Sequence, residues 1–324
     1  MPEITFHEAI RQAIWEEMER DKDVFVLGED VGVYGGAFKL TDGLLDHFGD
    51  KRVLDTPISE SAIIGAAIGS ALMGMRPIAE MQFMDFISCA FDIITNFAAK
   101  AHYRTGDSVP LVIRGPSGGN VHGGPFHSQN PEMYFAHTPG LKVIVPYSPY
   151  DAKGLLKAAV RDPDPVLFFE HKFLYRRIKE EVPEGDYVVP IGKARVRREG
   201  ADISVITYGQ LVGEALLAAE EVAGEGVDVE VLDLRTILPY DREAVLDTAR
   251  KTGKVILMCE DTATGAFTAE LSSLIAEEAF EHLDGPVIRL DHADTPVPYS
   301  PPLEMSLRPN KERLIAKIRQ LAAY

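Results

Sequence analysis

The stretch LDTPISESAIIGAAIGSALMGM, from Leu54 to Met75, places a short apolar strand before a turn and an apolar helix. Pro57 excludes a helix before it and Ser59 is a favourable N-cap, so the pattern predicts a helix that begins at Glu60. One face of this helix carries isoleucine and alanine at three- and four-residue spacing, and the other carries small residues. The pattern therefore predicts a helix buried on both faces.

Glu60 has two interpretations at this junction. It can be an acidic residue of a first helical turn, where the helix dipole favours negative charge. It can also be a carboxylate at the carboxyl end of a strand, which is the edge of an α/β sheet where ligands bind. Glu29 poses the same choice, because it follows a predicted strand over 24–27 and precedes the Gly-rich sequence VGVYGG.

Composition limits the class of protein. The chain has 324 residues, of which 46% are hydrophobic and 26% charged, and this indicates a soluble globular protein of about two domains. We expect a cytoplasmic location and no membrane span, because no secretory leader and no apolar run of about 20 residues is present. A net charge of −17 argues against nucleic acid and anionic membranes as partners. Cys89 and Cys259 are too few for a disulfide framework, so we expect both in the core.

Strand and helix patterns alternate along the chain, which predicts an α/β fold with two parallel-sheet lobes. We expect a first domain over residues 1–177, a linker with a short hairpin over 178–200, and a smaller domain over 201–324. A proline-rich arm is expected over 291–302. The main predicted elements of the first domain are helices over 6–21, 85–104 and 149–161 and strands over 24–27, 77–83, 109–113, 141–145 and 166–170.

A Gly-rich stretch, RGPSGGNVHGGPFHSQ, follows the strand over 109–113 and carries His122 and His127. A long Gly-rich loop in a compact domain is usually functional, whereas a lone loop histidine is usually a surface residue. Two histidines at a strand exit make one of them a candidate for proton chemistry. The sequence lacks a P-loop, a G-x-G-x-x-G turn between strand and helix, an H-E-x-x-H helix and a G-x-S-x-G elbow, which weakens the corresponding enzyme classes.

A series of short motifs runs along the chain: GED (Gly28–Asp30), DTPISE (Asp55–Glu60), RPIAEMQFMDF (Arg76–Phe86), HYRTG (His102–Gly106), FHSQ (Phe126–Gln129), HTPGLKVIVP (His137–Pro146), SPYDAKGLL (Ser148–Leu156) and LDLRTILPYD (Leu232–Asp241). In this order the motifs resemble the β subunit of the thiamine-diphosphate-dependent 2-oxo acid dehydrogenases, over essentially the whole chain. The resemblance implies a pyrimidine-binding lobe followed by a transketolase-like C-terminal lobe, in an α2β2 tetramer.

The resemblance assigns roles to residues. Glu60 matches the family's carboxylate that bonds the far nitrogen of the thiamine pyrimidine, and His127 matches the active-site histidine near the 2-oxo acid and the lipoyl group. His122 is expected to be structural. The residues expected around the cofactor are Glu29, Ile58, Ser59, Glu60, Gln82 and Phe86, and those expected around the substrate are Phe83, Met84, Asp85, Phe86 and His127.

The diphosphate and its Mg²⁺ are held in this family by a Gly-Asp-Gly motif, which the chain lacks. The resemblance therefore implies that the Mg²⁺ ligands lie on an α subunit. Some relatives bind K⁺ in the β subunit, at positions that correspond to the carbonyls of Leu111 and Val112 and to Asp162 and Asp164. The lipoyl acyltransferase core is expected to dock on the acidic C-terminal lobe.

The segment Gln82–Ile87, with the following Ala90–Asp92 and FHSQ, resembles branched-chain enzymes more than pyruvate enzymes, and acetoin enzymes share part of it. We therefore expect a β subunit that helps decarboxylate 2-oxoisovalerate or a similar 2-oxo acid. Pyruvate and acetoin dehydrogenases are the nearest alternatives. A non-catalytic scaffold subunit and a one-chain transketolase-type enzyme are alternatives of other classes, disfavoured by the intact site residues and by the missing diphosphate motif.

Overall fold

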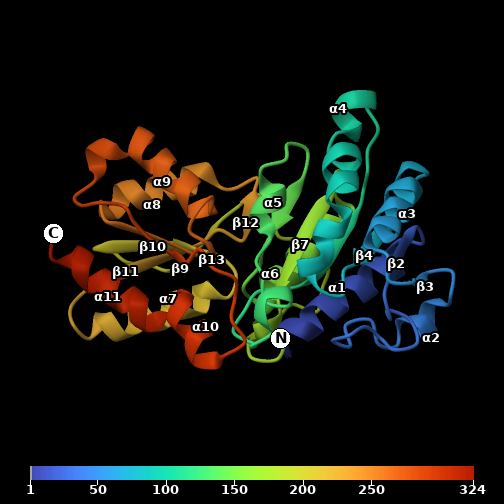
Figure 1. Cartoon of the computed structure of the whole chain (residues 1–324), viewed down its shortest axis with the longest axis horizontal. Helices are drawn as coiled ribbons and strands as arrows, with labels where there is room; N and C mark the ends of the chain where they lie inside the picture. The colour runs from blue at the N-terminus through green and yellow to red at the C-terminus, as the bar shows by residue number, and fades with distance from the viewer. Residues whose placement is uncertain (1) are drawn as a thin grey trace. The chain divides into compact units, whose positions relative to one another are not determined.

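Residues 2–324 are described by a computed structural model, and their contacts separate into two units (Figure 1). The first unit contains residues up to 117 and residues 134–191. The second contains residues 118–133 and 192–324. The Gly-rich loop with His122 and His127 therefore belongs to the second unit, although it follows a strand of the first.

The sheet of the first unit is parallel, with neighbouring strands in the order β6-β7-β5-β4-β2-β3. All its carboxyl ends therefore lie at one edge, where ligands bind in folds of this kind. The strand predicted over 77–83 ends at Glu80, so that Gln82 and Phe83 leave the sheet at this edge. The strands are β2 Val24–Gly28, β3 Val53–Asp55, β4 Arg76–Glu80, β5 Val112–Ser117, β6 Lys142–Ile144 and β7 Val166–His171.

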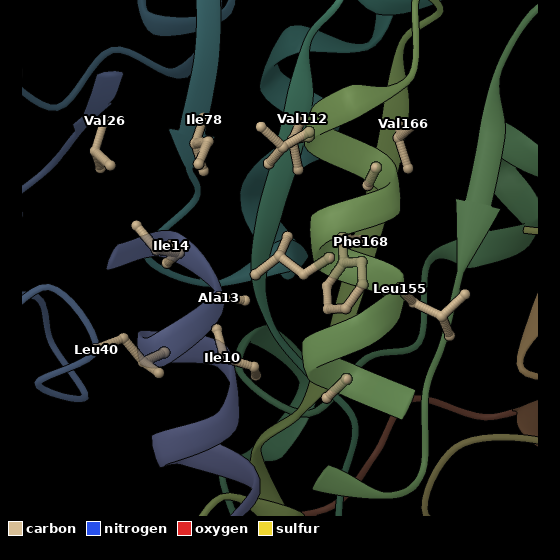
Figure 2. Packing of buried hydrophobic residues seen from close by; sticks show 14 of the residues in the cluster. Ile10, Ala13, Ile14, Val26, Leu40, Ile78, Val112, Leu155, Val166 and Phe168 are labelled. Atoms are coloured by element: carbon tan, nitrogen blue, oxygen red, sulfur yellow. The ribbon is translucent and has the colours of Figure 1, made fainter. Parts of the chain in front are cut away.

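Two helices, α1 (Phe6–Arg20) and α6 (Pro149–Arg161), pack against each other on one face of this sheet. Figure 2 shows Ile14 of α1, Leu155 of α6 and Phe168 of β7, which belong to the same buried cluster. This burial of branched and aromatic side chains supplies the main hydrophobic stabilisation of the unit.

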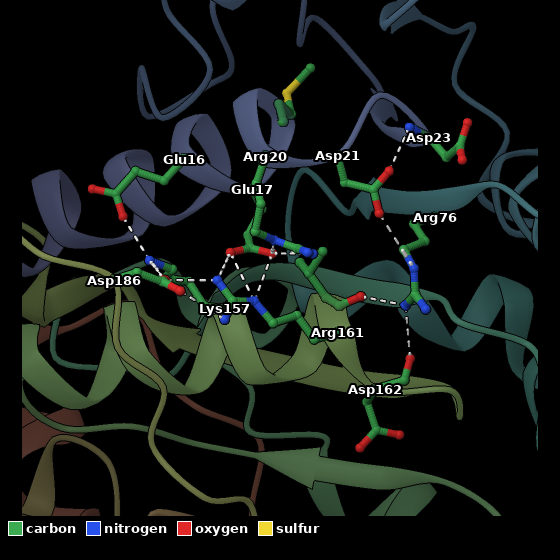
Figure 3. A network of polar contacts seen from close by, with 12 residues as sticks. Glu16, Glu17, Arg20, Asp21, Asp23, Arg76, Lys157, Arg161, Asp162 and Asp186 are labelled. Carbon is green, nitrogen blue, oxygen red and sulfur yellow. Dashed lines mark hydrogen bonds and ion pairs between the residues drawn. The ribbon is translucent and has the colours of Figure 1, made fainter.

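Charged side chains connect the same two helices (Figure 3). The Glu17 carboxylate is fully buried and accepts hydrogen bonds from Arg20 at 2.9 Å and from Arg161 at 2.5 Å. Arg161 also reaches Asp186 at 2.7 Å, and both pairings raise the pKa of Arg161. A buried carboxylate is stabilised when it is paired in this way, so this network fixes how α1 and α6 pack.

The helix expected over 85–104 is not continuous. It is divided into a 3-10 helix, a π-helix and a short α-helix, named η1, η2 and α4. At the division, the Thr95 hydroxyl donates to the carbonyl of Phe91 at 2.9 Å, and such local hydrogen bonds compete with regular helix. Phe97, within the π-helix, is 56% exposed. The remaining elements before β9 are β1 Glu3–Thr5, α2 Leu44–Phe48, α3 Glu60–Leu72, η1 Met84–Ala90, η2 Ile93–Ala98, α4 Ala101–Thr105, η3 Gly124–Phe126, α5 Glu132–Ala136, η4 Lys172–Leu174 and β8 Lys179–Glu181.

The expected hairpin between the domains is absent from residues 178–200. β8 pairs instead with β1 in an antiparallel ribbon, and β9 pairs antiparallel with β11 at the edge of the second sheet. Cys89 is exposed, contrary to expectation, whereas Cys259 is buried. Within residues 2–324, no helix combines the length and apolar character that crossing a membrane requires.

The second unit has a five-stranded sheet in the order β14-β13-β10-β11-β9, parallel except for β9. The alternation of strands and helices that predicted a second parallel-sheet lobe is confirmed, and the expected extended arm is shortened because a helix begins at Pro301. The strands are β9 Arg195–Arg198, β10 Ile203–Thr207, β11 Val229–Asp233, β12 Thr236–Leu238, β13 Val255–Thr262 and β14 Ile288–His292, and the helices are α7 Leu211–Ala223, α8 Arg242–Thr252, α9 Phe267–Glu278, η5 Phe280–His282, α10 Pro301–Leu307 and α11 Lys311–Ala322.

Candidate active site

The carboxyl edge of the first sheet gathers several of the predicted site residues. Glu29 directly follows β2, Glu60 begins α3 just after β3, and Gln82 lies two residues beyond β4. β2 pairs with both β3 and β4, so these three strand ends are adjacent. The parallel register therefore brings together side chains that are up to 53 positions apart in the sequence.

Glu29 is nearly buried, with 7% of its surface exposed. Burial raises the pKa of its carboxyl group, and the negative charges of Glu60 and Asp30 raise it further. Glu29 and Glu60 are therefore electrostatically coupled. Two neighbouring carboxyl groups, one of which has a raised pKa, favour a ligand that brings a proton or a positive charge to them.

Asp55 fixes the loop that follows Glu29. Its carboxylate accepts hydrogen bonds from the backbone N–H groups of Gly32 at 2.6 Å and Val33 at 3.3 Å. A side chain at Gly32 would collide with this carboxylate, because an added Cβ would lie 2.6 Å from Asp55 Oδ2. Asp55 thus joins the motif before α3 to the Gly-rich loop, a role that the sequence analysis did not identify.

Asp30 is a second residue that sequence reasoning missed. It has a left-handed backbone with φ of 57°, and its carbonyl accepts the N–H of Gly36 at 2.8 Å. Its carboxylate accepts a hydrogen bond from the Gln82 amide at 3.4 Å. The only sequence signal was its position beside Glu29, in a turn between a strand and a Gly-rich loop.

The segment after Gln82 places aromatic rings at this edge. Phe83 and Phe86 are half-buried and meet edge to face with centroids 6.4 Å apart. Met84 is fully buried and Asp85 is 7% exposed. A direct contact between Met84 and a substrate, as expected from the sequence, is therefore incompatible with its burial, and Phe83 and Phe86 are the residues available for contact.

A buried charged cluster supports the same edge. Arg114 of β5 is 1% exposed and bonds the carboxylates of Glu80 and Glu170, the latter through two nitrogens, one of them at 2.5 Å. The Tyr175 hydroxyl donates to Glu170 at 2.6 Å. Burial raises the pKa of Glu80, and the charge of Arg114 opposes that shift. Because Glu80 ends β4 and pairs with Gly28 of β2, this cluster holds the strand ends that carry Gln82 and Glu29.

Helix α3 begins at Glu60, as predicted, but it is not buried on both faces. Ile63, Ile64 and Ala67 are buried, whereas the small-residue face and the residues before the helix are exposed. Ile58 is 81% exposed, and Ser59 makes no side-chain capping bond. The exposed face consists of Ser61, Ala62, Ala66, Gly69, Leu72 and Met73.

His127 lies in the second unit, in the loop over 118–133. Its backbone N–H bonds the carbonyl of Gly124 at 3.3 Å, and the base of the loop is closed by a bond from Gly118 N–H to the carbonyl of Gln129 at 2.9 Å. The structure therefore describes the environment of His127 within the second unit and that of Glu60 within the first.

The two aspartates predicted as K⁺ ligands pair with a positively charged side chain of the protein itself. The ammonium of Lys142 bonds Asp162 at 2.5 Å and Asp164 at 3.0 Å. Arg76 donates to the carbonyl of Asp162 at 3.3 Å, and Leu111 accepts a backbone hydrogen bond from the sheet. Burial alone would lower the pKa of Lys142, but its hydrogen bonds to the two aspartates leave that pKa raised. Among residues 2–324, no group of three or more His, Cys, Asp or Glu side chains is arranged to hold a metal ion.

The edge of the first sheet fits a flat nitrogen heterocycle that can share a proton. Glu60 and Glu29 supply coupled carboxyl groups, Gln82 supplies an amide, and Phe83 and Phe86 supply aromatic surface. The aminopyrimidine of thiamine has these features.

Two family models match the chain: "Transketolase, pyrimidine binding domain" over residues 2–177 and "Transketolase, C-terminal domain" over residues 192–314. The 2-oxoisovalerate dehydrogenase subunit beta of Bacillus subtilis (strain 168) is 54% identical, and the match covers 100% of both chains. The 2-oxoisovalerate dehydrogenase subunit beta 2 of Arabidopsis thaliana is 44% identical over 99% of this chain and 90% of the relative. The pyruvate dehydrogenase E1 component subunit beta of Staphylococcus aureus (strain COL) is 44% identical over 100% of both chains.

A solved structure described as a split-gene transketolase, an inactive β4 tetramer, has the same fold. It superposes with a TM-score of 0.80 and covers 99% of this chain and 98% of its own, at 23% sequence identity. This likeness concerns the fold alone.

Proposed function

We propose, because this chain belongs to the family of 2-oxo acid dehydrogenase β subunits, that it forms half of a thiamine-diphosphate site for the oxidative decarboxylation of a branched-chain 2-oxo acid. The single observation that carries the proposal is that Glu29, Glu60 and Gln82 follow adjacent parallel strands at the carboxyl edge of a pyrimidine-binding unit.

The residues of this edge have separable roles. Thiamine diphosphate, when bound, supplies a thiazolium carbon that adds to the 2-oxo group and accepts the electrons left by departing CO₂. Glu60 holds a proton at the pyrimidine ring nitrogen farthest from the thiazolium. Glu29, whose pKa is raised, limits the negative charge around Glu60, and Phe83 and Phe86 exclude water from the ring.

The other half of the site is proposed to lie on an α subunit. This chain lacks the Gly-Asp-Gly diphosphate motif, and its described residues offer no metal cluster. The exposed small-residue face of α3, which begins at Glu60, is suited to close approach by another chain, because small side chains let backbones come near. We therefore propose an α2β2 tetramer, with Mg²⁺ bound by the α chain.

His127 is proposed to act in the second half reaction, in which the acyl group passes to the lipoyl domain of an acyltransferase. A histidine can donate a proton to a dithiolane sulfur as the S–S bond opens, and such proton transfer contributes about 10²–10⁴-fold in rate. Residues 201–324, which carry 22 acidic and 11 basic side chains, form the proposed docking surface for a basic domain of that acyltransferase.

The substrate class rests on the segment Gln82–Ile87 and on relatives named for 2-oxoisovalerate at 54% and 44% identity. A branched side chain adds about three carbons to the methyl group of pyruvate, and a fitted apolar pocket discriminates about 1–3 kcal/mol per methylene. The 44% identity to a pyruvate dehydrogenase subunit makes pyruvate the second candidate.

The test is the ratio kcat/KM of the enzyme reconstituted with its α subunit, measured side by side for 2-oxoisovalerate, pyruvate and acetoin. We expect 2-oxoisovalerate to have the highest value. A higher value for pyruvate or acetoin would replace the substrate assignment and leave the family unchanged, and no decarboxylation of any 2-oxo acid would reject the proposed function itself.

A further inference from the structure

The loop over 118–133 is held within the second unit by two carboxylates from distant parts of the chain. Glu304 of α10 is 1% exposed, and its Oε1 accepts the backbone N–H of Asn120 at 2.5 Å. Its Oε2 accepts the N–H of His122 at 3.2 Å and lies 2.6 Å from His122 Nδ1. Glu260 of β13 accepts the N–H of Gly119 at 2.8 Å. Three backbone donors of this short segment therefore converge on two carboxylates.

Glu260 is itself supported. The guanidinium of Arg308, which is 1% exposed, lies 3.3 Å from Glu260 and bonds Gln210 at 2.5 Å. A buried carboxylate without partners would be unfavourable, so the N–H of Gly119 and Arg308 satisfy Glu260 together. Both carboxylates that hold the loop therefore belong to the second unit.

The backbone of the loop requires such an anchor. Asn120 and His122 both have left-handed φ angles, of 62° and 60°, which non-glycine residues rarely adopt. Gly119 approaches both carboxylates so closely that an added Cβ would lie 2.8 Å from Glu304 Oε1 and 2.9 Å from Glu260 Oε1. The left-handed backbone at Asn120 and His122 and the missing side chain at Gly119 both allow the loop to approach the two carboxylates closely.

We propose that Glu304 is a positioning residue for His127. It fixes Asn120 and His122, and the bond between Gly118 and Gln129 closes the loop around His127, so the place of the imidazole is set by the second unit. The effect on catalysis rests on the function proposed for His127. The effect on the loop does not.

The first experiment measures hydrogen–deuterium exchange of residues 118–133 in the enzyme reconstituted with its α subunit. Glu304→Ala should speed exchange at Asn120 and His122 by at least about tenfold, because their acceptor is lost. Glu304→Gln, which keeps one acceptor oxygen, should give a smaller increase. Glu312→Gln, at a side chain that is 72% exposed on α11, is the matched control and should leave exchange unchanged.

The second experiment separates the two half reactions. Glu304→Ala should lower acyl transfer to a lipoyl domain by about 10–100-fold, as expected when a reacting group is displaced by about 1 Å, and should change decarboxylation with an artificial electron acceptor much less. Gly119→Ala attacks the same contact from the loop side while both carboxylates remain, and it should give the same pattern even if Glu304→Ala does not fold.

The outcomes distinguish the two proposals. Unchanged exchange in both Glu304→Ala and Gly119→Ala would overturn the positioning role of Glu304. Faster exchange with unchanged acyl transfer would overturn it as well, provided that His127→Ala lowers acyl transfer. If His127→Ala itself leaves acyl transfer unchanged, the function proposed for His127 is rejected, and the exchange data alone then decide whether Glu304 holds the loop.

Discussion

Glu29 and Glu60 lie 31 positions apart in the sequence, yet the charge of one acts on the other because both follow adjacent parallel strands. This placement follows from strand order, and the sequence indicates it once two strand ends are recognised. Asp55 and Asp30 were not recognised, because their function is to bond backbone groups of a loop whose conformation the sequence does not reveal. A residue's own chemical role was easier to predict than its role in holding other residues in place.

Substitution of Glu60 tests the residue-scale proposal. Glu60→Gln keeps the size of the side chain but cannot hold a proton in the same way, so decarboxylation should fall by about 10²–10⁴-fold. Steady-state turnover of the reconstituted enzyme measures this, with sedimentation velocity as the check that assembly is intact. Asp46→Asn, on the short helix α2, is a control of equal charge change. Near-normal decarboxylation by the Glu60→Gln variant would show that Glu60 does not hold a proton at the pyrimidine ring.

At the scale of elements, existence and type were predictable where one pattern ran for many residues. α6 was predicted with both its bounds, and α1 to within one residue of its end. The segment over 85–104 was not, because its apolar positions fit a helix while Thr95 bonds a backbone carbonyl and the helical hydrogen-bond pattern changes twice. The exposure of one face of α3 was also missed, since apolar periodicity indicates burial without saying whether the same chain provides it.

The ion pairs of Lys142 with two aspartates just beyond the end of α6 lead to a prediction about K⁺ binding. Lys142 lies between Asp162 and Asp164, so Lys142→Met should leave two carboxylates without their cation and lower the free energy of unfolding by about 1–3 kcal/mol. Urea unfolding measures this, with Lys22→Met at an exposed position as the control. We expect K⁺ to stabilise the variant more than the wild type. Equal stabilisation of the two by K⁺ would show that Lys142 does not take the place of that ion.

The ends of β13 and β14 carry a carboxyl group with a pH-dependent effect on stability. Burial raises the pKa of Asp261 to about 6, although hydrogen bonds from Thr262 oppose the shift. In the unfolded chain an aspartate titrates near about 3.9, so the folded state binds the proton more tightly. The stabilisation is fully present below about pH 4 and is lost as the pH rises through about 6.

Asp261→Asn removes this titration and keeps an oxygen that can accept the N–H of Thr262. At pH 8 the variant should be more stable than the wild type by on the order of 1–2 kcal/mol, and at pH 4 the difference should be small. Urea unfolding at the two pH values measures it. A difference that does not depend on pH would show that the carboxyl group of Asp261 is not the titrating group.

At the scale of the whole molecule, the alternation of strands and helices predicted two parallel α/β units, and the structure has two. The assignment of residues 118–133 to the second unit was not predictable, because it depends on Glu260 and Glu304, which lie more than 130 positions further along the chain. A pattern read along the sequence places this loop with the strand that precedes it.

The proposed half-site has a direct test in cofactor binding. The purified chain alone should bind thiamine diphosphate weakly and without dependence on Mg²⁺, because it lacks the diphosphate motif and a cluster of metal ligands among its described residues. Titration calorimetry with and without Mg²⁺ measures this, and the enzyme reconstituted with its α subunit is the positive control. Tight, Mg²⁺-dependent binding by the isolated chain would reject the division of the site.

Net negative charge is concentrated in the C-terminal part of the chain, and this makes the proposed docking sensitive to salt. Residues 201–324 carry a net charge of −11 out of the −17 of the whole chain, so a basic domain of the acyltransferase should be attracted mainly to this C-terminal part. The association rate constant should fall at least about tenfold between about 0.01 M salt, where the Debye length is about 30 Å, and about 1 M, where it is about 3 Å. Stopped-flow mixing measures this rate constant.

Neutralising the exposed Glu243 and Asp247 of the second unit should slow association more than neutralising the exposed Asp50 and Glu184 of the first. An association rate that is the same at both salt concentrations would show that the field of the second unit does not guide docking.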